Sequence, residues 1–195
     1  MVYDRIDLVK LFKPQLDEFL KYYKDLKIIS LPPRPGIGNQ SRHAYDISSS
    51  KALDLAKSMR SENRSIIADQ FQFDDLNLNM IDELSKIINQ NLEISGCFLY
   101  PENGGMSWHT NNDCPGIRIY FSFAYKSNCS FFRYQNSETG EIITDFDKGG
   151  WQCRVFSVGG EQSFWHCVQT LDSKRLSIGF GPKQYNETKN PILSN

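Results

Sequence analysis

The sequence lacks the features of several large protein classes. None of its apolar runs approaches the roughly 20 residues of a membrane-spanning helix, and residues 1–7 are too charged for a secretory signal peptide. No run is rich in Lys and Arg, and the net charge is −1 over 195 residues, so charge favours neither nucleic acid nor an anionic membrane as a partner. Internal repeats and low-complexity segments are also missing. We expect a single domain over 1–195, located in the cytoplasm.

Cysteine is scarce and unpatterned. The five cysteines are odd in number, scattered and without a Cys-x-x-Cys pair. This usage favours reduced thiols over a disulfide framework or a zinc knuckle. Cys167 is next to His166, but neighbours in a strand point to opposite faces, so we do not expect Cys167 to be a metal ligand.

The first half of the chain, 1–95, has the pattern of supporting helices. After Pro14, which suits a first helical turn, apolar residues recur at the spacing of one buried helical face. A second helix is predicted over 51–59, preceded by serines that can cap it. A third is predicted over 74–92. We expect these helices to cover one face of a sheet.

From residue 96 the sequence changes to short segments rich in aromatic and β-branched residues, separated by turns that contain Gly, Pro or Asn. About eight short strands at this spacing predict a β-sandwich or jelly roll over 96–182. A polar tail follows at 183–195. The predicted strands are 96–100, 105–110, 117–125, 130–134, 141–144, 152–158, 162–168 and 176–180.

Two of the three histidines lie in this strand-rich half. His109 and Asn111 are two residues apart, so in an extended strand they project to one face, about 6.6 Å apart. Side chains at that separation can converge on one ion, and His166 supplies a third ligand from a distant strand. Two histidines and one oxygen ligand leave three positions of an octahedron open, as in non-haem iron(II) sites.

An anion-binding pair follows the second of these histidines. Arg175 and Ser177 share one face of a predicted strand, and apolar residues occupy the other face. A guanidinium beside a hydroxyl is a good holder of a carboxylate. The sequence therefore predicts a metal that works with an acidic co-substrate.

In order and spacing, these residues resemble the 2-oxoglutarate- and iron(II)-dependent oxygenases, closest to the prolyl-hydroxylase-like branch. That family has His-x-Asp/Glu, a second His about 50–60 residues on, and then an Arg, often in Arg-x-Ser, after about ten more. His109, His166 and Arg175-Leu176-Ser177 fall at those places. The lead-in Tyr-Pro-Glu-Asn-Gly-Gly at 100–105 is also similar to the family's.

The resemblance implies a mainly β protein with N-terminal helices around a double-stranded β-helix (jelly roll). It implies a dioxygenase that uses Fe(II), 2-oxoglutarate and O2 to hydroxylate an unactivated C–H bond. The primary substrate is then a peptide or protein, with proline the nearest analogy, or a small molecule. His109, Asn111 and His166 would hold the iron, and Arg175 with Ser177 would bind the far carboxylate of 2-oxoglutarate.

Tyrosines commonly assist that carboxylate in prolyl-hydroxylase-like members. By register from His109, Tyr100 and Tyr125 match best. Tyr120 is the alternative to Tyr125, although the register directs it to the opposite strand face. An ordinary aromatic role in the core or at the surface stays open for each tyrosine.

One position departs from the family, because Asn111 stands where the carboxylate is expected. Asp113 is the other candidate for the third ligand, provided that the chain curls back after Asn111. A non-catalytic jelly-roll binding module with a degraded metal site is the alternative function. Halogenases of this superfamily have Ala or Gly at the carboxylate position, so Asn111 does not match them.

Overall fold

The structure is a computed structural model that describes residues 5–29, 49–58, 66–72, 79–160 and 163–184. The predicted polar tail lies mostly outside these residues. The described helices and strands are, in chain order, α1 Arg5–Leu11, α2 Lys13–Tyr22, the 3₁₀ helix η1 Tyr23–Asp25, β1 Ile28–Ile29, α3 Ser50–Ser58, β2 Ile66–Ile67, β3 Asp69–Phe71, α4 Ile81–Ile88, β4 Leu92–Tyr100, β5 Gly105–His109, β6 Gly116–Ala124, β7 Ser130–Gln135, β8 Ile142–Phe146, β9 Gly150–Val158, β10 His166–Thr170 and β11 Arg175–Pro182.

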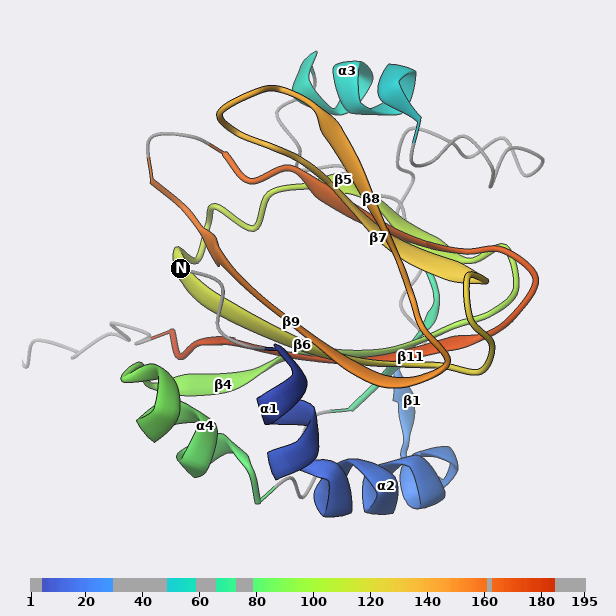
Figure 1. The fold of residues 1–195 in the computed structure, drawn as a ribbon, viewed down its shortest axis with the longest axis vertical. Coiled ribbons are helices and arrows are strands. Elements are labelled where there is room, and N and C mark those ends of the chain that lie inside the picture. Colours follow the sequence, from blue (N-terminus) through green and yellow to red (C-terminus); the bar gives the residue numbers. More distant parts are fainter. Residues whose placement is uncertain (1–4, 30–48, 59–65, 73–78, 161–162, 185–195) are drawn as a thin grey trace, which may run out of the picture.

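Two antiparallel sheets face each other (Figure 1). One has the strand order β1-β3-β4-β11-β6-β9, and the other has the order β2-β5-β10-β7-β8. Figure 1 shows α1, α2 and α4 packed on the outer side of the first sheet and α3 on the outer side of the second. This arrangement confirms the predicted fold, mainly β with N-terminal helices. The fold is a jelly roll.

Strand β11 shows how alternation divides the first sheet. It pairs with β4 on one side and with β6 on the other. Leu176, Ile178 and Phe180 are fully buried in the main hydrophobic core, together with Leu16 and Phe19 of α2. Their alternate neighbours, among them Arg175 and Ser177, face the space between the sheets. The predicted division of this strand into an apolar and a polar face is therefore confirmed.

The helices follow the sequence pattern in part. Helix α2 begins next to Pro14, as predicted, and Ser49 caps α3 by accepting a 3.1 Å hydrogen bond from the backbone N–H of Ala52. Of the third predicted helix, 74–92, residues 74–78 lie outside the described residues, and the described part is helical only over α4, Ile81–Ile88. Asn89 ends it in the left-handed conformation, with φ 54°, and β4 starts three residues later.

Three short strands within the first half of the chain were not predicted. Strands β1 and β3 extend the edge of the first sheet, and β2 pairs with β5 in the second. Segments of two or three residues are too short to show a period, so the pattern of 1–95 as helical support missed them. Strand β10 likewise begins at His166 rather than at the predicted residue 162.

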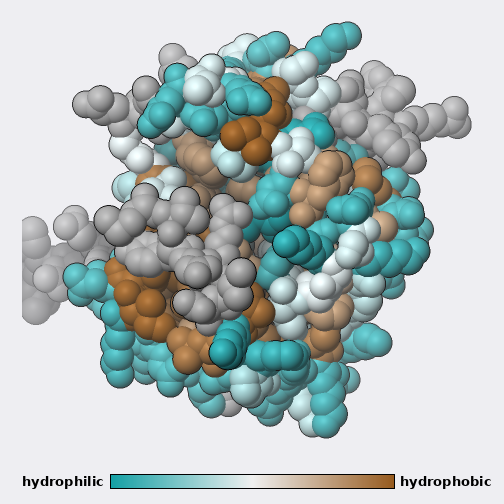
Figure 2. Space-filling model, in the orientation of Figure 1, coloured by the Kyte–Doolittle hydropathy of each residue, from teal (hydrophilic) through white to brown (hydrophobic). Residues whose placement is uncertain are grey.

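Figure 2 shows one face of the molecule, on which hydrophilic and hydrophobic areas both appear. In Figure 2, hydrophilic side chains cover most of the outer rim of this face, including the helices at the foot of the view. Among the described helices, none is both long and apolar enough to span a bilayer.

Candidate metal and ligand site

A cavity of about 270 Å³ lies between the two sheets. Both sheets line it: β5 and β10 contribute His109 and His166, and β6 and β11 contribute Tyr120 and Ser177. Pockets for small organic ligands in proteins begin at roughly 300 Å³. The cavity is therefore of the size that holds a small organic molecule.

The two histidines meet across neighbouring strands. His109 of β5 and His166 of β10 are register partners, and their ring centroids lie 4.1 Å apart. Nδ1–H of His109 donates to the Ser107 carbonyl at 2.7 Å, and Nδ1–H of His166 donates to the Phe164 carbonyl at 3.0 Å. A carbonyl oxygen only accepts, so each Nδ1 carries the proton and each neutral ring has its lone pair on Nε2. Metal-binding histidines are commonly oriented in this way.

Asn111 joins the histidines through a local change of backbone direction. Strand β5 ends at His109, and Asn111 adopts the left-handed conformation, with φ 57°, which asparagine tolerates better than most residues. Its amide lies 3.3 Å from Nε2 of His166 and donates to the Tyr120 hydroxyl at 3.4 Å. Rotating the amide by half a turn would place its oxygen there instead. The extended geometry expected for His109 and Asn111 is wrong, but the three side chains still gather.

The turn after Asn111 curls back, as the Asp113 alternative required. The N–H of Cys114 donates to the Asn111 carbonyl at 3.2 Å, and Asp113 lines the same cavity with its side chain exposed. Within the described ranges, however, no three His, Cys, Asp or Glu side chains lie close enough to hold one metal ion. Asp113 therefore does not group with the histidine pair, and the polar side chain beside the pair is Asn111, whose amide is 3.3 Å from Nε2 of His166.

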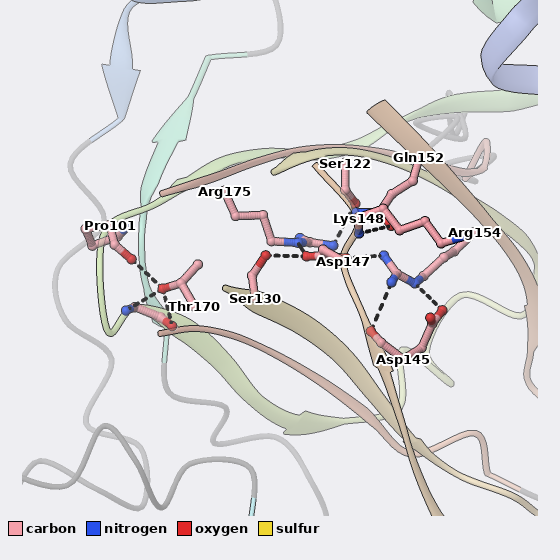
Figure 3. A network of polar contacts seen from close by, with 11 residues as sticks. Pro101, Ser122, Ser130, Asp145, Asp147, Lys148, Gln152, Arg154, Thr170 and Arg175 are labelled. Carbon is pink, nitrogen blue, oxygen red and sulfur yellow. Dashed lines mark hydrogen bonds and ion pairs between the residues drawn. The ribbon is translucent and has the colours of Figure 1, made fainter. Parts of the chain in front are cut away.

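Arg175 lies behind the cavity wall, against the ring of Tyr100, and already holds a carboxylate of this chain. It is fully buried; its Nε donates to Asp147 Oδ2 at 2.8 Å and its Nη2 to Ser122 Oγ at 2.6 Å. Asp147, itself fully buried, also pairs with Arg154 at 2.7 Å and accepts from the Ser130 hydroxyl. Figure 3 shows Asp147 between the two guanidinium groups. The predicted carboxylate anchor thus has an internal carboxylate as its partner.

The environment of Asp147 keeps that carboxylate charged. Burial alone would raise its pKa, but Arg175 and Arg154 act in the opposite direction and hold the pKa of Asp147 below its ordinary value. An ionised group in this position neutralises one of the two arginines. A second anion would have to displace Asp147 to reach the donors of Arg175 that it occupies.

The predicted tyrosines are divided by the structure. Tyr100 lines the cavity, and the Arg175 guanidinium lies 5.7 Å from its ring centroid, a cation–π contact. Tyr125 is on the helical side of the sheet, where its hydroxyl lies 2.9 Å from that of Tyr23. Tyr120, the alternative in the sequence, is the one that lines the cavity. Counting register from His109 failed because the turn at Asn111 breaks the alternation.

Sequence reasoning missed Arg118. This arginine of β6 lines the cavity, and only 5% of it is exposed. Its spacing from Tyr120 could have indicated this position, because Arg118 precedes Tyr120 by two residues in a strand and so shares its face. Arg118 belongs to none of the motifs that the sequence shares with the oxygenase family.

The chain matches no protein-family model and none of the curated proteins. Among solved structures, it is similar to a Pseudomonas putida prolyl-4-hydroxylase, with 15% identity and a TM-score of 0.45, over 88% of this chain and 100% of that one. A 2OG-Fe(II) oxygenase family oxidoreductase from Burkholderia pseudomallei has 10% identity and a TM-score of 0.42, over 86% and 90%.

A mutant family 29 carbohydrate-binding module is also similar, with 12% identity and a TM-score of 0.28, over 52% of this chain and 84% of that one. The prolyl-4-hydroxylase and the oxidoreductase are of the family that the sequence motifs resemble. At these identities and TM-scores, the likeness establishes no activity for this chain.

Proposed function

We propose that the chain is an iron(II)-dependent oxygenase of the 2-oxoglutarate type that hydroxylates an unactivated C–H bond. The observation that carries this proposal is the histidine pair. The ring centroids of His109 and His166 are 4.1 Å apart, and in each ring Nδ1 donates to a backbone carbonyl, which leaves Nε2 for a metal. The Asn111 amide lies beside His166, in a cavity of ligand size. Two imidazoles and an amide oxygen suit a divalent iron site. When bound, iron(II) with 2-oxoglutarate and O2 supplies the oxidising chemistry.

The residues of this chain hold and orient the reactants. The backbone carbonyls of Ser107 and Phe164 fix the two imidazole rings, so neither ring has to reorient when a metal enters. Phe132, Phe156 and Phe164 surround the His166 ring with centroids at 5.4, 5.2 and 5.4 Å. This aromatic wall excludes water from one side of the site, which strengthens electrostatic interactions within it.

Anaerobic titration with iron(II) and 2-oxoglutarate tests the proposal. A chelate formed at the histidine pair gives a weak visible charge-transfer band. We expect this band in the parent protein, its loss in His109→Ala and His166→Ala, and its retention in Asp113→Ala. Circular dichroism of each variant checks that the fold is intact. If the folded parent protein binds no iron(II), or if His109→Ala binds it equally well, the proposal fails.

The structure also favours the second candidate, a non-catalytic binding module. The third ligand position has a neutral amide instead of a carboxylate, and Arg175 is neutralised within the chain by Asp147. Both features weaken the grip on a metal and on 2-oxoglutarate at Arg175. This candidate predicts that the folded protein binds small ligands in the cavity with no dependence on iron(II). The same titration, repeated with and without the metal, separates the two.

A further inference from the structure

Arg118 lines the cavity, whereas Arg175 does not, and no carboxylate of the described residues pairs with Arg118. Each of the two arginines has one buried donor without a hydrogen-bond partner among these residues, Nε of Arg118 and Nη1 of Arg175. Nη2 of Arg118 donates to the Cys114 carbonyl at 2.7 Å. A buried donor without a partner is costly, and the cost is larger for a charged group. A guanidinium with such a donor, in a side chain that lines a cavity, is a candidate group for binding a ligand.

The chain makes room for this guanidinium. Gly181 of β11 lies beside it, and a Cβ added there would collide with Nη1 of Arg118. Any other residue at 181 would push the guanidinium from its place. The side chain is thus held between the Cys114 carbonyl and the bare backbone of Gly181, at the wall of the cavity.

The position of Arg118 suits an anchor for one end of a ligand. On β6, Arg118 and Ser122 stand two residues to either side of Tyr120, about 6.8 Å away along the strand in each direction. Tyr120 faces the His166 ring at 6.5 Å between centroids. Arg175 hydrogen-bonds to Ser122, on one side of Tyr120, whereas Arg118 lies on the other side of Tyr120. The exposed residues that line the cavity, Asp113 and Gln184 among them, mark its mouth near Arg118.

We propose that Arg118 binds the carboxylate of a small organic acid whose other end lies at the histidine pair. A guanidinium offers two parallel donors to a carboxylate, and Nε is one of them. Glu93 and Asp113 line the same cavity, and their negative charge disfavours a phosphate dianion more than a single carboxylate. This inference deepens the proposed function. It rests on that function only where the acid is identified as 2-oxoglutarate.

Calorimetric titration of the metal-free protein, in the presence of a chelator, tests this inference. The probes are glutarate, 2-oxoglutarate and inorganic phosphate. We expect both dicarboxylates to bind and Arg118→Gln to weaken them at least tenfold, because the ligand loses a charged partner. Arg118→Lys should retain part of the affinity. Phosphate should bind more weakly than glutarate to the parent protein.

Arg133→Gln is the matched control. Arg133 is on β7, donates to Thr144 at 2.8 Å and stacks over Phe131, and it does not line the cavity. We expect this variant to bind glutarate like the parent protein. The inference is overturned if the parent protein binds no dicarboxylate, if phosphate binds more tightly, or if Arg118→Gln binds glutarate unchanged. Because no metal is present, failure of the proposed iron site leaves these outcomes unaffected.

Discussion

The two arginines that flank the histidine pair have opposite environments. Arg175 lies behind Tyr100 of the cavity wall, at what we call the closed end. It is bound to Asp147 and Ser122, and Asp147 is shared with Arg154 (Figure 3). Arg118, toward the mouth, has one backbone carbonyl as its only described partner and an unpaired Nε. The same residue type therefore serves as part of the folded structure at one end and is available to a ligand at the other.

The comparison shows that a motif identifies a residue but not its partner. Arg175 is in the strand and on the face that the sequence predicted, yet the carboxylate it holds comes from the chain itself. A buried charge must be paired, and here Asp147 already does this for the empty protein. An arginine reserved for a ligand is instead expected to line the cavity without a carboxylate partner, and among the described residues Arg118 meets both conditions.

The largest effect is expected from removing the carboxylate at the closed end. Asp147→Asn leaves the buried Arg175 guanidinium without its counter-charge and Arg154 with Asp145 alone, which should lower the free energy of unfolding by about 3–5 kcal/mol. Asp145→Asn is the control, since Asp145 also pairs with Arg154 but its side chain is 36% exposed. It should cost less than about 1 kcal/mol. Urea denaturation measures both, and equal costs would contradict the account of the closed end.

The same substitution at each arginine sharpens the comparison. Arg175→Gln leaves Asp147 buried with only Arg154 as a charged partner and should cost about 3–5 kcal/mol of stability. Arg118→Gln removes one bond to a carbonyl and should cost about 1–2 kcal/mol. Urea denaturation of the two variants gives the difference directly. A larger cost at Arg118 than at Arg175 would show that the two roles have been exchanged.

Between the two ends, the charge of the metal site can be changed at one position. Asn111→Asp adds a carboxylate beside His166 and should tighten iron(II) binding about tenfold, or about 1.4 kcal/mol. Asp113→Ala should leave iron binding nearly unchanged, because Asp113 does not group with the histidines. Calorimetry under anaerobic conditions compares the two. If Asp113→Ala abolishes iron binding and Asn111→Asp leaves it unchanged, the third ligand is Asp113 and not Asn111.

The mildest test of the closed end uses pH. The folded-state pKa of Asp147 lies below its ordinary value of 3.8, so the stability due to its charge is fully present above the ordinary value. It is lost as the pH falls through the folded-state pKa. Urea midpoints measured from about pH 6 down to about pH 3 should fall less steeply in Asp147→Asn than in the parent protein. Parallel slopes would mean that Asp147 does not titrate as described.

The sequence predicted the strands of the second half well, because the alternation of side chains along a strand is a local property. It predicted that His109 and His166 meet, which they do as register partners. It assigned Tyr125 to the site in preference to Tyr120, although Tyr120 is the one that lines the cavity. The left-handed backbone of Asn111 interrupts the alternation of side chains, so faces counted from His109 do not carry over to β6. The Arg175–Asp147 pair joins β11 to the segment between β8 and β9, and no pattern within either segment encodes that contact.

The central claim is that the cavity offers Arg118, and not Arg175, to an acidic ligand. Arginine Nε–H signals in a nitrogen-15 NMR spectrum report on each guanidinium separately, once Arg118→Lys and Arg175→Lys have assigned them. Titration of the metal-free protein with glutarate should move the Arg118 signal and leave that of Arg175 in place. A shift of the Arg175 signal with an unmoved Arg118 signal would contradict the account.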